Sequence, residues 1–140
     1  MSDKLIQSFE DGTLPSTEFH HRDHVRLAWL YLKEEPVLTA LTRFTEGLKR
    51  FAARHGHAGL YHETITWAYF FLIHERMARG AEANAAETWE EFAERNADLL
   101  TWKPSVLDGY YQAETLASPL AKSVFVLPDS SLGAPAPRRL

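Results

Sequence analysis

Apolar residues recur every three or four positions along most of the chain, the spacing that places them on one face of a helix. Residues 5–9 follow this pattern and predict a short first helix, which Gly12 ends. A second helix is predicted to begin at about Ser16 or Asp23 and to end near Lys33. Its apolar face is wide, which is typical of a helix at the centre of a fold.

Two longer helices are predicted in the middle of the chain. One begins at Pro36, because the first position of a helix does not need the N–H that proline lacks, and ends before Gly56. The other covers about residues 61–79 and stops at Gly80. Its apolar residues lie on nearly all sides, which indicates a helix buried among several neighbours.

The last third of the chain predicts shorter elements. Asn84 and Glu87 fit a capping box at the start of another helix. Short helices are expected after Pro104 and over residues 114–122, followed by an extended, packed segment at residues 124–127. Because no alternating strand pattern interrupts these helices, the predicted fold is all-α.

The expected architecture is a single-domain bundle of five to six helices over residues 1–128. Residues 129–140 are rich in Ser, Gly, Ala and Pro and predict a mobile C-terminal tail. A chain of 140 residues is long enough to form one hydrophobic core.

The composition narrows the classes of function. A formal net charge of -4 gives no electrostatic support for nucleic-acid binding. The sequence contains 0 cysteines, so disulfides and thiolate chemistry are excluded, and any metal must be held by histidine and carboxylate. The longest apolar block, residues 67–73, is too short to cross a bilayer, and the N-terminus does not resemble a signal peptide, so a cytoplasmic bacterial-type protein is expected.

Histidines concentrate where the second predicted helix begins. His20, His21 and His24 lie within five residues, and His21 and His24 are three apart, so both imidazoles can reach one point. His62 and Glu63 lie where the fourth predicted helix begins. We expect the two helix starts to face each other, with His21, His24 and His62 binding a divalent metal ion, Zn or Fe.

Glu63 and Tyr61 are the candidate catalytic residues beside that metal. Glu63 could be a fourth ligand, a hydrogen-bond acceptor for a ligand histidine, or a general base near bound water. Tyr61 could donate a hydrogen bond from the wall of a pocket, and Tyr111 is a second tyrosine in that role. The alternative explanation requires no chemistry, because histidines at helix starts also act as caps or pair with carboxylates such as Asp23.

The remaining histidines are expected to lie away from the site. His55 and His57 belong to a glycine-containing loop and are expected to be solvated, although His57 could turn toward the site. His74 is expected to be a core or interhelical residue. Two known motifs are excluded: Thr66 stands where a zinc-protease HExxH motif requires histidine, and the HD-type phosphohydrolase pair requires His before Asp.

Three segments together are similar to an uncharacterised family of small bacterial helical proteins. They are FxHxxHxRxA at residues 19–28, YHETxT at residues 61–66, and a block from Tyr110-Tyr111 through Leu116-x-Ser118 to Val126-x-Pro128-Asp129. The resemblance implies that the shared polar positions are His21, His24, His62, Tyr61 and Glu63, and that His20 varies. It carries no activity that can be transferred.

The leading hypothesis is a small metal-dependent enzyme, a hydrolase or an oxygenase, that acts on a small molecule. One alternative is a metal-free binding or sensing module whose histidines and Tyr61 hydrogen-bond a ligand. The other is an interaction protein, such as a homodimer, whose histidines form a buried hydrogen-bond network. Nucleic acid and membrane are not expected partners.

Overall fold

The computed structural model describes residues 4–130, and every regular element in that range is helical. It contains α1 (Lys4–Asp11), α2 (His21–Glu34), α3 (Val37–Arg54), α4 (Glu63–Ala83), α5 (Trp89–Arg95), α6 (Ala113–Leu116) and α7 (Pro119–Ser123), with short 3₁₀ turns η1 (Ser16–Glu18), η2 (Ala58–Leu60), η3 (Ala97–Leu100) and η4 (Val106–Gly109). The predicted all-α class is confirmed, and the expected five to six helices roughly match.

One predicted helix, over residues 114–122, is divided into α6 and α7. The division falls at Pro119, the first residue of α7. Ser118 caps α7 by accepting a hydrogen bond from Ala121 N–H at 3.1 Å. Proline cannot donate to the preceding turn and disfavours helical backbone at the residue before it, so one continuous helix cannot form here.

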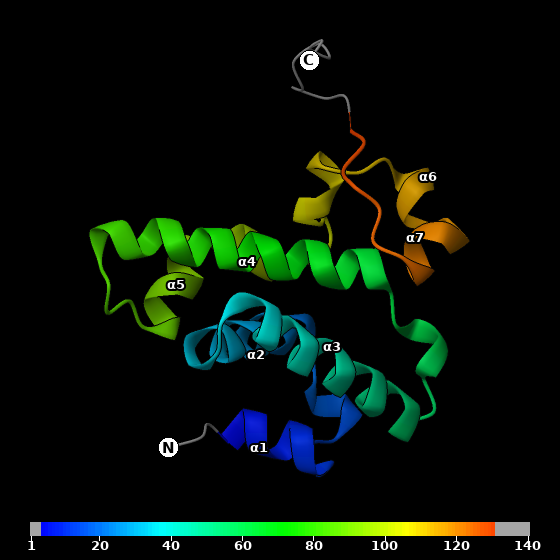
Figure 1. Ribbon diagram of the computed structural model, residues 1–140, viewed down its shortest axis with the longest axis horizontal. Helices are drawn as coiled ribbons and strands as arrows, with labels where there is room; N and C mark the ends of the chain where they lie inside the picture. The colour runs from blue at the N-terminus through cyan, green and yellow to red at the C-terminus, as the bar shows by residue number, and fades with distance from the viewer. Residues whose placement is uncertain (1–3, 131–140) are drawn as a thin grey trace.

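Helix α4 crosses the middle of the molecule (Figure 1). Helices α2 and α3 lie along one side of it, with α1 beyond them, and the short elements η4, α6 and α7 lie on the other side. Helix α2 is central as predicted: Leu27, Ala28 and Tyr31 are completely buried where it packs against α3 and α4.

The predicted end of α4 at Gly80 is wrong, because the helix continues to Ala83. Gly80 is buried inside the helix, and the side chains of Arg95 and Glu87 cover the position where a Cβ would point. A glycine that ends a helix adopts a left-handed conformation, as Gly12 does with φ of +84° after α1. Here glycine instead permits close approach of an ion pair.

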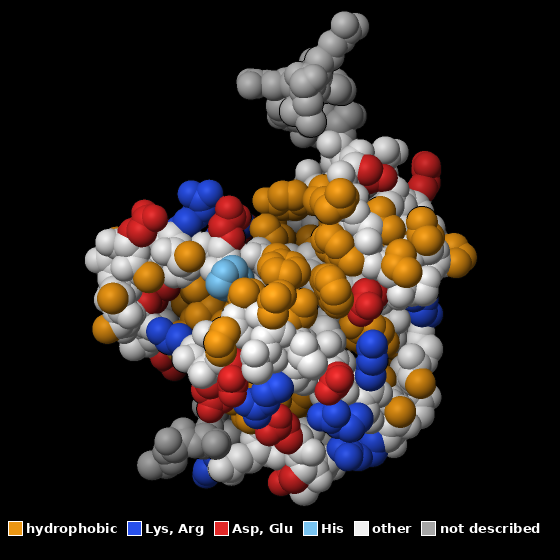
Figure 2. Space-filling model, viewed as in Figure 1, with side chains coloured by type: hydrophobic (Ala, Val, Ile, Leu, Met, Phe, Trp, Pro, Cys, Tyr) orange, Lys and Arg blue, Asp and Glu red, His pale blue; other side chains and the backbone are white. Residues whose placement is uncertain are grey.

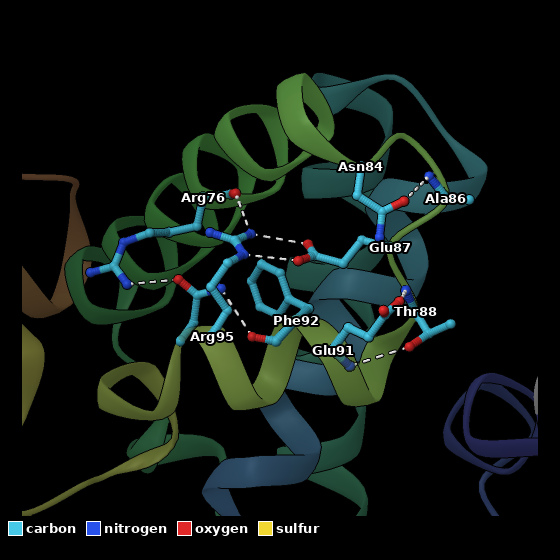
Figure 3. Close-up of polar contacts among 9 residues, drawn as sticks. Arg76, Asn84, Ala86, Glu87, Thr88, Glu91, Phe92 and Arg95 are labelled. Carbon is cyan, nitrogen blue, oxygen red and sulfur yellow. Dashed lines mark hydrogen bonds and ion pairs between the residues drawn. The ribbon is translucent and has the colours of Figure 1, made fainter.

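The predicted capping box at Asn84 and Glu87 is also wrong, and Figure 3 shows the arrangement that replaces it. Thr88 caps α5 by accepting a hydrogen bond from Glu91 N–H at 3.2 Å, and the Glu91 carboxylate accepts from Thr88 N–H at 2.9 Å. Glu87 instead binds Arg95 through two contacts of 2.8 and 3.0 Å. The true box lies four residues further along the chain.

The extended segment after α7 is fastened to the rest of the fold. Val126 N–H donates to Thr64 on α4 at 3.0 Å, and Tyr111 donates to Val126 O at 2.7 Å. Asp129 and Ser130, assigned by the sequence to the tail, both donate backbone hydrogen bonds to Tyr110 O, at 3.1 and 3.0 Å. The rest of the predicted tail, residues 131–140, lies outside the described residues.

Apolar side chains gather on the surface over α4 and the segments that cross it (Figure 2). A groove of about 280 Å³ is lined by Phe71 of α4, Tyr110 and Phe125. No helix within residues 4–130 has both the length and the apolar character needed to span a membrane.

Candidate functional site

The first turn of α2 holds two of the predicted site histidines. Asp23 accepts a hydrogen bond from His20 N–H at 3.0 Å, which begins the helix, while the His20 side chain is exposed. His21 donates from Nε2 to Leu99 O of η3 at 2.8 Å. Burial lowers the pKa of His21, and the hydrogen bond to Leu99 opposes that effect. The imidazole is therefore held neutral and fixed in orientation.

His24 lies one turn further along α2, in a more buried environment. Its ring stacks on Phe19 with centroids 4.0 Å apart. Burial and, to a smaller extent, nearby His21 lower the pKa of His24 to about 4, although Asp23 opposes the shift. Neither ring nitrogen has a hydrogen-bond partner within residues 4–130, so His24 is a neutral imidazole with both nitrogens free.

His62 has a structural role at the start of α4. Its Nδ1 accepts a hydrogen bond from Ile65 N–H at 3.1 Å, as a helix cap does, and its Nε2 donates to Leu116 O of α6 at 2.7 Å. The two contacts fix one neutral tautomer and use both nitrogens. His62 therefore joins α4 to the last third of the chain.

Tyr61 and Glu63 form a pair next to His62. The Tyr61 hydroxyl donates to Glu63 Oε1 at 2.6 Å, and the Lys49 ammonium lies 5.0 Å from the centre of the Tyr61 ring. Burial raises the pKa of Tyr61, and the Glu63 carboxylate raises it further. The tyrosine is therefore a firmly protonated donor, and Glu63 is occupied as its acceptor.

These residues meet around one cavity of about 570 Å³ between α2, α3 and α4. Its wall contains fully buried residues such as Ala28 and Phe70 and exposed ones such as Leu60 and Trp102, so it runs from the surface into the core. The histidines that line it are His21, His24, His55, His57 and His62. The aromatic residues that line it are Phe19, Phe44, Phe51, Tyr61, Tyr69, Phe70 and Trp102.

Four of the five predicted site residues line this cavity, and Glu63 is not among the lining residues. The structure thus brings His21, His24, His62 and Tyr61 to one place. Tyr111 lies elsewhere, buried in a second cluster with Tyr69 and Leu107. Whether any of these residues binds a metal stays a prediction.

Two lining residues were missed or misplaced by sequence reasoning. His55 was expected in solvent, but its ring packs against Phe51 with centroids 4.4 Å apart, and its Nε2 is buried with no hydrogen-bond partner within residues 4–130. An unpaired buried polar atom costs about 1–3 kcal/mol, so it is rarely left without a purpose. His57 does line the cavity, whereas His74, expected in the core, is exposed.

The geometry needed for a metal is incomplete as the side chains stand. Within residues 4–130, no three His, Asp or Glu side chains are grouped so that they could hold one metal ion. His62 would have to give up at least its hydrogen bond from Ile65 N–H before Nδ1 could bind a metal, whereas no hydrogen bond to a described residue occupies the ring of His24. The arrangement more readily supplies hydrogen bonds to a molecule that enters the cavity.

The fold and the site define a small all-α domain with a histidine-lined, largely aromatic cavity. Comparison with known proteins adds no assignment, since no family model, curated protein or solved structure matches the chain.

Proposed function

We propose that this chain is a small-molecule binding module whose ligand occupies the cavity between α2, α3 and α4. The observation that supports it best is the combination of a cavity of about 570 Å³ with His24, whose ring nitrogens have no hydrogen-bond partner within residues 4–130. Protein interiors are close-packed, and voids larger than a water molecule are few. A cavity of this size falls in the range of small-molecule sites, which are mostly apolar with a few polar groups.

The fixed and free histidines have different roles in this proposal. His21 and His62 are held by carbonyl groups of Leu99 and Leu116, so they shape the wall. His24 is rigid, because it stacks on Phe19, yet it retains hydrogen-bonding capacity. A preorganised imidazole of this kind can donate to or accept from a ligand without first losing another bond.

Adjacent alanines on α3 provide a matched test. Ala52 lines the cavity and Ala53 is exposed and does not line it. A panel of small metabolites is screened by thermal shift with a chelator present, and we expect at least one to stabilise the native protein. That stabilisation should be lost in Ala52→Phe and kept in Ala53→Phe, with circular dichroism confirming that both variants fold. A panel without any stabilising molecule, or one whose hits act equally on both variants, contradicts the proposal.

A metal-dependent enzyme is the second candidate. It is favoured by His21 and His24, which are one turn apart on the same wall, and by the unpaired Nε2 of His55. Protein purified without a histidine tag should then contain roughly one Zn or Fe per chain, as expected for a site with three protein ligands. Substoichiometric metal together with no uptake of added Zn or Fe would exclude this candidate.

Partners and location follow the same proposal. We infer a small-molecule ligand and a cytoplasmic setting, the latter from the sequence features described above. A homodimer stays a prediction, to be measured by light scattering.

A further inference from the structure

The charge of the cavity wall restricts what can enter. Among the described residues that line it, none is Asp, Glu, Lys or Arg. Two such groups flank the lining residue Tyr61: Glu63 accepts its hydroxyl, and Lys49 packs over its ring. An ion that enters loses its hydration, and this loss is costly unless the site supplies an opposite charge.

Burial also keeps His21 and His24 from supplying that charge. Burial lowers the pKa of both His21 and His24, and for His24 the value is about 4. At neutral pH these imidazoles are dipoles and not cations. They can hydrogen-bond a neutral group but cannot neutralise an anion.

The apolar part of the wall consists of ring faces and edges. Phe19 stacks on His24 and meets Phe51 edge-on with centroids 4.9 Å apart. At the first residue of α2, the His21 ring lies 5.1 Å from the Trp102 ring, between centroids. Offset and edge-to-face contacts of this kind favour another flat ring over an aliphatic chain.

We propose, building on the binding function above, that the ligand is an uncharged aromatic molecule with one neutral polar group hydrogen-bonded to His24. The ring system packs against Phe19, Phe51 and Trp102. His55, whose Nε2 is buried without a partner within residues 4–130, becomes the second hydrogen-bonding residue when its ring turns toward the ligand.

Four naphthalenes of nearly the same shape test the charge and the hydrogen bond separately. They are 2-naphthol, naphthalene, 2-naphthoate and 2-(aminomethyl)naphthalene, measured against the native protein by calorimetry at pH 7. We expect 2-naphthol to bind at least about tenfold more tightly than the carboxylate and the ammonium compounds, which corresponds to about 1.4 kcal/mol. 2-Naphthol should also bind more tightly than naphthalene, because naphthalene has no group that can form a hydrogen bond with His24.

Substitution at His24 connects the preference to that residue. In His24→Phe, which keeps a ring stacked on Phe19, the advantage of 2-naphthol over naphthalene should disappear while naphthalene still binds. In His74→Phe, on the exposed side of α4, the advantage should remain. Carboxylate or ammonium binding as tight as that of the naphthol overturns the inference and leaves the binding function standing. An advantage that persists in His24→Phe also overturns it.

The two proposals fail in distinguishable ways. If no naphthalene binds but a metabolite from the panel above does, the inference on ligand class is wrong and the binding function is supported. If neither the naphthalenes nor any metabolite binds, both proposals fall together.

Discussion

His24 and His62 both lie near the start of a helix, His24 in the first turn of α2 and His62 as the N-cap of α4, and yet their environments are opposite. Both nitrogens of His62 are used, by Ile65 N–H and by Leu116 O. Those of His24 have no hydrogen-bond partner within residues 4–130, and its ring is stacked in an apolar wall. The difference arises from which distant segments pack over each ring, and it separates a structural histidine from one available to a ligand.

The low pKa of His24 predicts that the protein loses stability in mild acid. His24 titrates at about 4 in the folded chain, against an ordinary value of 6.5 when unfolded. Between these values the unfolded state binds more protons, so the free energy of unfolding rises with pH in that window. Well above pH 6.5, His24 is neutral in both the folded and the unfolded state and does not change the stability. At pH 4, its protonation in the unfolded state lowers the free energy of unfolding by about 3 kcal/mol.

Urea unfolding at pH 7 and pH 5.5 measures this effect. From pH 7 to pH 5.5, the free energy of unfolding of the wild type should fall by about 1 kcal/mol more than that of His24→Gln, because glutamine does not titrate. His74→Gln, at an exposed histidine, is the control and should follow wild type. Equal losses in wild type and His24→Gln would show that His24 is not the buried neutral group described here.

At the scale of elements, α1 packs closely against α3 where α3 carries Gly47. A Cβ built on Gly47 would clash with the ring of Phe9, which is buried on α1. The Phe9 ring in turn lies 5.5 Å from Phe19 and 5.8 Å from Phe51, between centroids, and both of those rings line the cavity. Gly47 therefore sets how closely α1 supports the cavity wall.

Gly47→Ala should lower the free energy of unfolding by about 1–2 kcal/mol. Overpacking a core costs about 1–3 kcal/mol, which exceeds the gain of about 1 kcal/mol from replacing glycine in a helix. In a Phe9→Leu background the clash is relieved, so the same substitution should be neutral or stabilising. A double-mutant cycle measured by urea unfolding gives the coupling, and no coupling between the two positions would contradict the fit described.

The elements show what local sequence can and cannot predict. Pro36 and Gly56 mark the limits of α3 because proline and glycine act on the backbone of their own turn. The prediction that Gly80 ends α4 was wrong because the glycine makes room for the side chains of Arg95 and Glu87, which follow α4 in the sequence. Local signals identify helices, and contacts distant in sequence decide where some of them end.

The site was predictable to a similar extent. Clustering near two helix starts was enough to single out His21, His24, His62 and Tyr61, which line one cavity. The carbonyl groups that hold His21 and His62 could not be predicted, since every residue has one and only the fold selects Leu99 and Leu116. His55 was missed because the glycine that follows it indicates a loop, while its burial depends on the packing of α3.

For the molecule as a whole, one buried hydroxyl of α4 holds the extended segment that follows α7. Thr64 is completely buried, donates to Val124 O at 2.8 Å and accepts from Val126 N–H at 3.0 Å. The segment it holds runs beside Tyr111, whose hydroxyl bonds Val126 O. A side chain in the first turn of α4 thus supplies two of the polar contacts of an extended segment that pairs with no strand within residues 4–130.

Thr64→Val tests this arrangement, because valine keeps the shape and removes the hydroxyl. Two partly buried backbone groups then lose their partner, and a polar group left unpaired away from water costs about 1–3 kcal/mol. Water satisfies both groups once the segment leaves α4, so we expect local opening at a cost below the full sum. Hydrogen exchange at Val126 N–H should accelerate strongly, and the free energy of unfolding should fall by about 2 kcal/mol.

Thr64→Ser separates the hydroxyl from the packing, since serine retains both hydrogen bonds and loses only a methyl group. This variant should keep the Val126 amide protected from exchange. Its free energy of unfolding should fall by about 1 kcal/mol, because one buried methyl group is lost. Protection that survives in Thr64→Val, or is lost equally in both variants, would show that Tyr111 and the apolar contacts hold the segment without Thr64. Slow exchange of the Val126 amide in Thr64→Ser together with fast exchange in Thr64→Val would show that the two hydrogen bonds of Thr64 hold the segment on α4.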